Sequence, residues 1–349
     1  MDSLKLKAKI EKQEWSLQIL RERYYKTLYS ERKEKPSVIR QKINDRYAVY
    51  LGDSVEVLRG IPSDSVHYTI FSPPFSSLFT YSASLRDLGN STNAQFYEQF
   101  SFMIPEMLRV TMPGRLLTFH CSDLPIMKER DGYIGVRDFP GILIRLFEGA
   151  GWIYHSRVTV WKDPLLEATR TKALGLLHKQ LCKDSAMCRQ GGPDYLVTMR
   201  KPGNNPEPIS RKRGFETYVG EKPEPRHVKN DDKMLNKYSH EVWQRYASPV
   251  WFDINQTKTL NVKLAREKED ERHICPLQLQ VIERCLELWS NPNDIVASWF
   301  AGIGSEGYIS LQKGRRFLGI ELKETYYNLM VKNLNSVLGR RHLKGFWEK

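Results

Sequence analysis

The sequence predicts an α/β protein with a doubly wound, mostly parallel sheet. Short apolar segments of strand length alternate with segments of helical spacing, and several strands lead through a loop into a helix. The first such unit has a strand at 48–51, a helix at 54–59 and a second strand at 67–71. Gly52-Asp53 follows the first strand, and Asp53 is a candidate cap for the helix.

The same alternation continues towards the C-terminus. Helical spacing recurs at 96–110, 139–149 and 276–289, and strands are predicted at 114–120, 152–161, 194–199, 295–300 and 316–321. Parallel strands need long crossover connections, which are usually helical. This order therefore favours one large sheet with helices on both faces.

Composition divides the chain into four parts. Residues 1–45 are predicted to form a basic N-terminal arm, helical as far as 35, where Pro36 ends the apolar periodicity. Residues 46–200 and 256–349 carry the strands. Between them, 201–255 is rich in Pro, Gly, Lys and Arg, so a small irregular insertion is predicted there.

The charge balance favours a polyanionic partner. The chain has 54 Lys and Arg against 41 Asp and Glu, a net charge of +13. Nucleic acid is favoured over an anionic membrane surface. Arg211-Lys212-Arg213, followed by Phe215 and Tyr218, combines cations with aromatic rings and is the candidate DNA-binding run, with a solvated loop as the alternative.

Other features of the composition indicate the redox environment and whether the chain binds a metal or a membrane. The five cysteines include no Cys-x-x-Cys pair, which favours a reduced, cytoplasmic environment. No metal site is predicted. No apolar run approaches the length of a membrane span, so no membrane partner is expected.

A first candidate for chemistry follows the strand at 67–71. This strand ends in Ser72-Pro73-Pro74-Phe75. The two prolines fix φ and lack N–H groups, so the corner is stiff and presents carbonyl acceptors, a hydroxyl and an aromatic face. Such a set suits a flat ring that bears an exocyclic amine. A plain Pro-Pro turn is the alternative.

A second candidate follows the strand at 295–300. Phe300-Ala301-Gly302-Ile303-Gly304 and the residues up to Gly307 have the spacing Gly-x-Gly-x-x-Gly, which lets a ligand approach the backbone. Glu321 ends the next strand with a carboxylate that suits ribose hydroxyls. A nicotinamide dehydrogenase shares this pattern but usually begins with it, whereas here it lies near the C-terminus.

Together, the two corners resemble those of the amino-methylating DNA methyltransferases, which use S-adenosylmethionine. That family has a catalytic motif (Asp/Asn/Ser)-Pro-Pro-(Tyr/Phe) and a cofactor motif Phe-x-Gly-x-Gly, matched here by 72–75 and 300–304. The catalytic motif comes first, as in the circularly permuted β group. The resemblance implies a Rossmann-like methyltransferase fold, with 46–200 as the catalytic half, 201–255 as the target-recognition insertion and 256–349 as the cofactor-binding half.

The resemblance also implies roles for individual residues. It implies that S-adenosylmethionine is held by a set of cofactor-binding residues: Asp53 at the adenine, Glu321 at the ribose, and Phe300, Ala301, Gly302 and Gly304. It implies that Ser72, Pro73, Pro74 and Phe75 hold a base flipped out of double-stranded DNA. Serine at the first position resembles the cytosine-N4 branch and aspartate is usual in the adenine-N6 branch, so cytosine N4 is favoured, with adenine N6 as the alternative.

Rival functions of other classes are a non-catalytic DNA-binding protein, which has no need of both corners, and a methyltransferase for RNA or for protein glutamine. Asn is typical of the glutamine enzymes at the first catalytic position, where this chain has Ser72. The expected location is the cytoplasm of a bacterium or a phage-infected cell, associated with the nucleoid. A homodimer and an accompanying restriction nuclease are left open.

Overall fold

The computed structural model describes residues 38–74, 93–126, 132–133, 135–171, 174–188, 190–225, 232–261 and 276–347. Every structural statement below concerns these described residues. The helix predicted at 1–35 and the aromatic residue Phe75 lie outside them.

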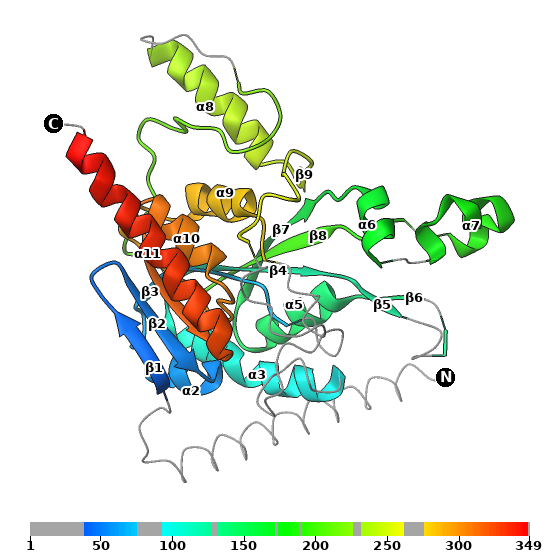
Figure 1. Cartoon of the computed structure of the whole chain (residues 1–349), viewed down its shortest axis with the longest axis horizontal. Helices are drawn as coiled ribbons and strands as arrows, with labels where there is room; N and C mark the ends of the chain where they lie inside the picture. Colours follow the sequence, from blue (N-terminus) through cyan, green and yellow to red (C-terminus); the bar gives the residue numbers. More distant parts are fainter. Residues whose placement is uncertain are drawn as a thin grey trace. The chain divides into compact units, whose positions relative to one another are not determined.

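The centre of the fold is a nine-stranded sheet with the strand order β1-β2-β11-β10-β3-β4-β8-β7-β9 (Figure 1). The strands are β1 Val38–Ile43, β2 Tyr47–Gly52, β3 Val66–Phe71, β4 Thr111–Ser122, β7 Ile153–Val160, β8 Asp194–Arg200, β9 Val250–Trp251, β10 Ile295–Ser298 and β11 Arg316–Glu321. The neighbours β2, β11, β10, β3 and β4 run parallel. Strand β8 is antiparallel to both β4 and β7, so β7 has the direction of the parallel strands. The predicted mostly parallel sheet is confirmed.

Helices cover both faces of this sheet (Figure 1). The helices α2 Ser54–Arg59, α3 Asn93–Val110 and α5 Phe139–Gly149 pack on one face, and α9 Leu279–Trp289, α10 Ser305–Gln312 and α11 Glu324–Trp347 pack on the other. Strand β3 is buried on both sides, with Ile70 packed towards α9 and Phe71 towards α3. Burial on both faces explains why apolar and aromatic residues predominate in its sequence, VHYTIF.

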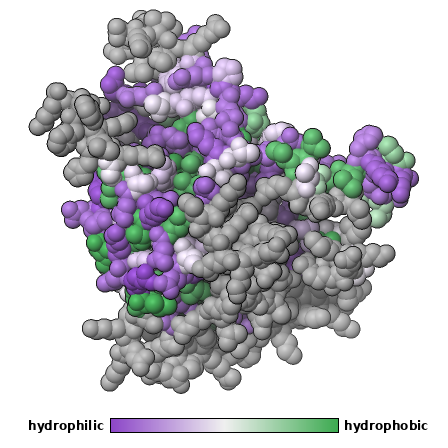
Figure 2. Space-filling model, in the orientation of Figure 1, coloured by the Kyte–Doolittle hydropathy of each residue, from purple (hydrophilic) through white to green (hydrophobic). Residues whose placement is uncertain are grey.

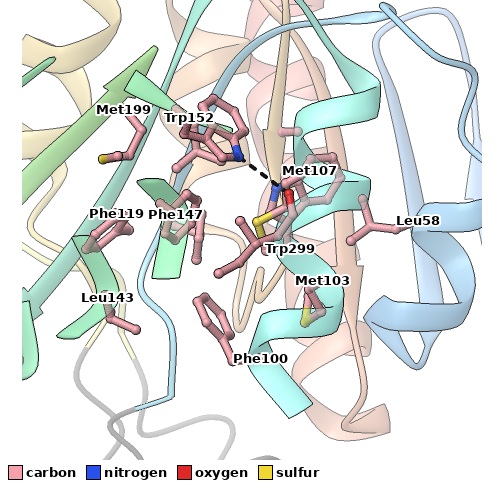
Figure 3. Close-up of a cluster of buried hydrophobic side chains, with 14 of the residues drawn as sticks. Leu58, Phe100, Met103, Met107, Phe119, Leu143, Phe147, Trp152, Met199 and Trp299 are labelled. Carbon is pink, nitrogen blue, oxygen red and sulfur yellow. Dashed lines mark hydrogen bonds between the residues drawn. The ribbon is translucent and has the colours of Figure 1, made fainter. Parts of the chain in front are cut away.

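The α3 and α5 face holds the largest group of aromatic core residues (Figure 3). Phe100, Phe119 and Phe147 lie here with Trp152 and Trp299. The indole nitrogen of Trp152 donates a hydrogen bond to the carbonyl of Ile104 in α3 at 3.4 Å. This core fixes the end of β10, where Trp299 lies, against the helices that follow β3 and β4.

The boundary predicted for the N-terminal arm is corrected by β1. Residues 38–43 were assigned to the arm, but they pair antiparallel with β2 as an exposed edge strand. The Arg40 guanidinium bonds to Glu324 and, at 3.0 Å, to Asn328, both on α11. Backbone pairing with β2 and this link to α11 hold the segment extended.

The segment 201–255 is more regular than its proline content predicted. It contains α8 Asp232–Tyr246 and β9, with a small hydrophobic cluster of its own. The buried Arg284 joins this segment to α9, which packs on the sheet. The Arg284 guanidinium bonds to the carbonyl of Val219 and, at 2.9 Å, to the carboxylate of Asp253. Removing one partner of a buried ion pair costs on the order of 3–5 kcal/mol, so this contact holds the segment in place.

The remaining described elements connect the strands. They are β5 Leu124–Ile126, β6 Gly135–Arg137, α6 Pro164–Thr171, the 3-10 helix η3 Leu174–Leu176, α7 His178–Lys183 and the 3-10 helix η4 Ser185–Met187. None of the helices in the described ranges combines the length and the apolar character that crossing a membrane requires.

Candidate active site

The predicted catalytic and cofactor-binding residues that the structure describes lie at one edge of the sheet. Parallel strands end at a common edge, here called the carboxyl edge, and β2, β11, β10 and β3 are neighbours there. Their ends carry, in the same order, Asp53, Glu321, the corner 300–304 and Ser72. Neighbouring strands are about 4.8 Å apart, so the structure brings the cofactor corner and the catalytic corner together. The rings of Phe71 and Phe300, 5.8 Å apart, connect them directly.

The glycines of the cofactor corner have different roles. Gly302 and Gly304 have φ values of +52° and +85°, in the left-handed region that favours glycine. A Cβ on Gly302 would meet no atom within 4 Å, so space is open in front of it. A Cβ on Gly304 would lie 2.8 Å from Met330, and one on Gly307 would lie 2.5 Å from the Phe317 ring. Gly302 therefore leaves room for a ligand, whereas Gly304 and Gly307 permit close packing.

Two acidic residues stand behind this corner. The Glu321 carboxylate accepts hydrogen bonds from the N–H groups of Gly302 at 2.7 Å and Lys323 at 2.8 Å. Burial, followed by the nearby charge of Glu321, raises the pKa of Glu306 to about 8. Glu306 is therefore protonated at neutral pH.

Asp53 follows β2, the strand next to β11 at the carboxyl edge. Its carboxylate caps α2 by accepting from the Val55 N–H at 2.9 Å. The next residue, Ser54, donates its hydroxyl to the carbonyl of Trp299 at 2.6 Å. This bond fixes the start of α2 against the end of β10.

The corner fits S-adenosylmethionine. Open space at Gly302 admits a ligand against the backbone, and Glu321 supplies an acceptor at the end of the next strand. The buried hydroxyl of Ser305, in the first turn of α10, has no hydrogen-bond partner among the described residues. It is available to a polar group of the ligand.

The catalytic corner contains a further set of polar contacts. Pro73 is buried and Pro74 half-buried. The Ser72 Oγ lies 3.0 Å from Nδ1 of His120, the Nε2 of His120 lies 3.1 Å from Oδ2 of Asp194, and Oδ1 of Asp194 lies 2.5 Å from Nζ of Lys162. These contacts join four residues from neighbouring strands of the sheet. They are Ser72 after β3, His120 in β4, Asp194 at the start of β8 and Lys162 after β7, and they are called the polar row below.

The charges of the polar row determine how Ser72 is used. Burial by itself would raise the pKa of Asp194, but His120 and Lys162 outweigh it and lower this pKa to about 2. The ionised Asp194 favours a proton on Nε2 of His120, which leaves Nδ1 as an acceptor for the Ser72 hydroxyl. With its own proton directed to His120, the Ser72 oxygen has lone pairs available for an incoming donor.

Sequence reasoning missed His120, Asp194 and Lys162. His120 was placed at the end of a predicted strand and Asp194 at the start of another. Because β8 is antiparallel, its first residue lies at the edge where β3 and β4 end. The sequence did show polar residues at these strand ends. Only the order of the strands in the sheet shows that these residues lie close together.

The basic run 211–213 lies away from this site. Arg211 pairs with Glu287 of α9 at 3.1 Å and lies over the Phe215 ring, while Lys212 and Arg213 are exposed. Glu287 lies near the end of α9, and the residues after α9 lead into the start of β10, at the edge opposite Ser72. The structure therefore does not bring the run together with the catalytic corner, and Arg211 is engaged within the protein.

This fold and its two adjoining corners define an α/β methyltransferase. The chain belongs to the N6/N4 DNA methylase family, whose sequence profile matches residues 66–332. S-adenosylmethionine is accordingly its cofactor and DNA its substrate.

Relatives match most of the chain. The Type II methyltransferase M.BglI of Bacillus subtilis is 20% identical over 327 residues, covering 82% of this chain and 84% of the relative. The Type II methyltransferase M.BglII of Bacillus subtilis is 23% identical over 289 residues, covering 82% of this chain and 68% of the relative.

Solved structures share the fold. TTHA0409 of Thermus thermophilus, crystallised with S-adenosyl-L-methionine, has a TM-score of 0.56 at 20% identity, covering 84% of this chain and 95% of that one. The PvuII DNA methyltransferase, described as cytosine-N4-specific, has a TM-score of 0.56 at 14% identity, covering 87% of this chain and 96% of that one.

Proposed function

We propose that this chain transfers a methyl group to N4 of a cytosine flipped out of double-stranded DNA, as a member of the circularly permuted β group. The observation that carries this proposal is the residue at the first catalytic position. It is Ser72, which resembles the cytosine-N4 branch, and its hydroxyl bonds to His120 rather than being free to rotate. Adenine N6 is the alternative target.

The chemical task is to activate an amine. When bound, S-adenosylmethionine supplies a methyl group made electrophilic by its sulfonium. The amine on cytosine is a weak nucleophile because its lone pair is conjugated with the ring. Ser72 Oγ and the carbonyl of Pro73 accept hydrogen bonds from the two N–H groups, which localises the lone pair on nitrogen. The stiff Pro73-Pro74 corner holds these acceptors in place, so positioning supplies much of the rate.

The polar row also accounts for the proton that N4 loses. As N4 takes the methyl group, the S–C bond of the sulfonium breaks and its sulfur leaves as a neutral thioether. The amine N–H proton passes to Ser72 Oγ, and the Ser72 proton passes to Nδ1 of His120. The imidazole becomes an imidazolium, which the ionised carboxylate of Asp194 stabilises at 3.1 Å. The proton then returns to solvent from His120. The transfer from Ser72 to His120 follows the 3.0 Å contact between Oγ and Nδ1.

The product nucleoside tests this proposal. The purified chain is incubated with unmodified DNA and S-adenosylmethionine, and the digested nucleosides are analysed by mass spectrometry. We expect N4-methyldeoxycytidine and no N6-methyldeoxyadenosine. A Ser72→Ala preparation, purified in the same way, controls for methyltransferases carried over from the host.

Two outcomes would contradict the proposal in different ways. N6-methyldeoxyadenosine alone would mean that Ser72 does not indicate the target base. If neither methylated nucleoside appeared while calorimetry showed binding of S-adenosylmethionine and of DNA, the non-catalytic alternative would replace it.

A further inference from the structure

Two large aromatic side chains are exposed at the carboxyl edge beyond the polar row. Strand β7 ends at the buried Val160, and the next residue, Trp161, is 47% exposed. Strand β9 ends at the buried Trp251, and the next residue, Phe252, is 57% exposed. Neither aromatic side chain is used by the hydrophobic core.

Trp161 and Phe252 are neighbours across the β7–β9 pair. Val160 and Trp251 are partners in the parallel register, and the Trp161 N–H donates to the Trp251 carbonyl at 2.9 Å. Val160 and Trp251 share one cluster on the α9 face. Since side chains alternate along extended strands, the two following residues point together away from that cluster.

Further exposed apolar side chains follow Trp161 in the chain, and a positive charge lies at Phe252. Leu165 and Leu166 at the start of α6 are 72% and 45% exposed, and hydrophobic residues are visible on α6 in Figure 2. The ammonium of Lys222 lies 5.1 Å from the centre of the Phe252 ring. Lys162, next to Trp161, belongs to the polar row. Trp161, Leu165, Leu166 and Phe252 are called the aromatic rim below.

The position of the rim suits DNA beside the target base. Strands β7 and β9 are three and four steps from β3 in the sheet, about 14 Å and about 19 Å at about 4.8 Å a step. A base held at Ser72 has swung out of the duplex, so the DNA around it extends beyond the base pocket over distances of this size. A flipped base leaves its neighbours partly unstacked, and exposed aromatic or leucine side chains can fill such openings.

We propose that the aromatic rim is a DNA-contact surface, on which Trp161 and Phe252 stack against the bases exposed when the target base flips. The proposal rests on the base flipping of the proposed function. The positive charge of Lys222 beside Phe252 favours a polyanion over a second copy of a chain whose net charge is +13. Aromatic stacking tolerates any base, so the rim supports opening of the duplex rather than recognition of its sequence.

A duplex that is already open provides the test, because it needs no knowledge of the recognition sequence. The probes are a fully paired 30-base-pair duplex and the same duplex with a central cytosine opposite an abasic site. Binding is measured by fluorescence anisotropy with the full chain, for the wild type and for Trp161→Ala, Phe252→Ala and the double variant. Phe252→Leu retains apolar area without an aromatic face.

Tyr154→Ala is the matched control. Tyr154 is also an exposed aromatic residue of β7, 40% accessible, but it lies seven residues before Trp161. At about 3.3 Å per residue, this is about 23 Å away along the strand, towards the opposite edge of the sheet. Its removal tests whether any exposed aromatic residue on this strand affects DNA binding.

We expect the wild type to bind the opened duplex more tightly than the paired one. The double rim variant should lose about tenfold or more of its affinity for the opened duplex, and less for the paired one, because stacking is available only where bases are exposed. Phe252→Leu should fall between the wild type and Phe252→Ala. Tyr154→Ala should match the wild type, and all variants should bind S-adenosylmethionine as the wild type does.

Unchanged affinity of the double variant for the opened duplex would overturn the proposal. So would a wild-type dimer in sedimentation that the rim substitutions dissociate without any effect on DNA binding, since the rim would then be a surface for a second copy. Both measurements are independent of methyl transfer. Failure of the rim is therefore distinguishable from failure of the proposed function, which the product nucleosides report.

Discussion

In the proposed reaction, the uncharged hydroxyl of Ser72 holds the amine of the target base. This role depends on His120, whose Nδ1 lies 3.0 Å from the Ser72 hydroxyl, and on Asp194, whose carboxylate lies 3.1 Å from Nε2 of His120. Asp194 has a pKa lowered to about 2, so it is ionised throughout the neutral range. Because this folded-state pKa is depressed, its contribution to stability is complete above the ordinary pKa of an aspartate and is lost as the pH falls through about 2.

Substitution of His120 separates its two proposed roles. His120→Asn can retain an acceptor for the Ser72 hydroxyl but cannot take up a proton, whereas His120→Phe can do neither. We expect kcat to fall by about 100-fold or more in His120→Phe and by less in His120→Asn, because general acid–base groups contribute about 10²–10⁴-fold. Single-turnover transfer of a radiolabelled methyl group to DNA measures both.

The deficit should persist across the neutral pH range, in which Asp194 stays ionised. Affinity for S-adenosylmethionine should be unchanged in both variants, since His120 lies at the end of β4 and not at the cofactor corner. Wild-type turnover in His120→Phe would show that the polar row has no part in the reaction.

At the scale of elements, the cofactor corner is a turn between β10 and α10 whose glycines serve different needs. Gly302 has open space in front of its α-carbon, whereas Gly307 lies against Phe317 at the packing of α10 on the sheet. The same substitution should therefore have different main effects at the two positions, on ligand binding at Gly302 and on stability at Gly307.

We expect Gly302→Ala to weaken binding of S-adenosylmethionine by about tenfold or more, since the added methyl group enters the space proposed for the ligand. Its left-handed φ adds a strain of about 1 kcal/mol to the free energy of folding. Gly307→Ala should destabilise the protein by about 1–3 kcal/mol through overpacking against Phe317. Calorimetry and urea unfolding measure the two effects.

Comparison of the two glycine variants is the internal control. Full cofactor affinity in Gly302→Ala would mean that the open space at this residue is not the binding site. A loss of stability in Gly302→Ala well above the backbone strain of about 1 kcal/mol would mean that Gly302 is also a packing position.

At the scale of elements, the sequence predicted those features that depend only on residues close together in the chain. The unit β2, α2 and β3 follows from local periodicity and the Asp53 cap, and both corners follow from Pro and Gly at strand ends. The polar row was not predicted because it joins residues 72, 120, 162 and 194, which meet only once the antiparallel position of β8 is known. Strand β1 was missed because its alternation is weak and its residues are mostly exposed.

For the whole molecule, the central claim is that the parallel sheet assembles one site from two distant parts of the chain. The catalytic corner at 72–74 and the cofactor corner at 300–304 are far apart in sequence but follow the neighbouring strands β3 and β10. The net charge of +13 attracts DNA to the molecule, and phosphate contacts of this kind weaken as salt rises. Affinity and chemistry can therefore be measured separately.

The most direct measurement compares Ser72→Ala with the wild type for cofactor affinity, DNA affinity and methyl transfer on the same preparations. Ser336→Ala, an exposed serine of α11, is the control. Removal of the acceptor should leave both affinities within about twofold and reduce single-turnover methyl transfer by about 100-fold or more, as loss of one positioned polar group does in other active sites. Methyl transfer at the wild-type rate in Ser72→Ala would contradict the account.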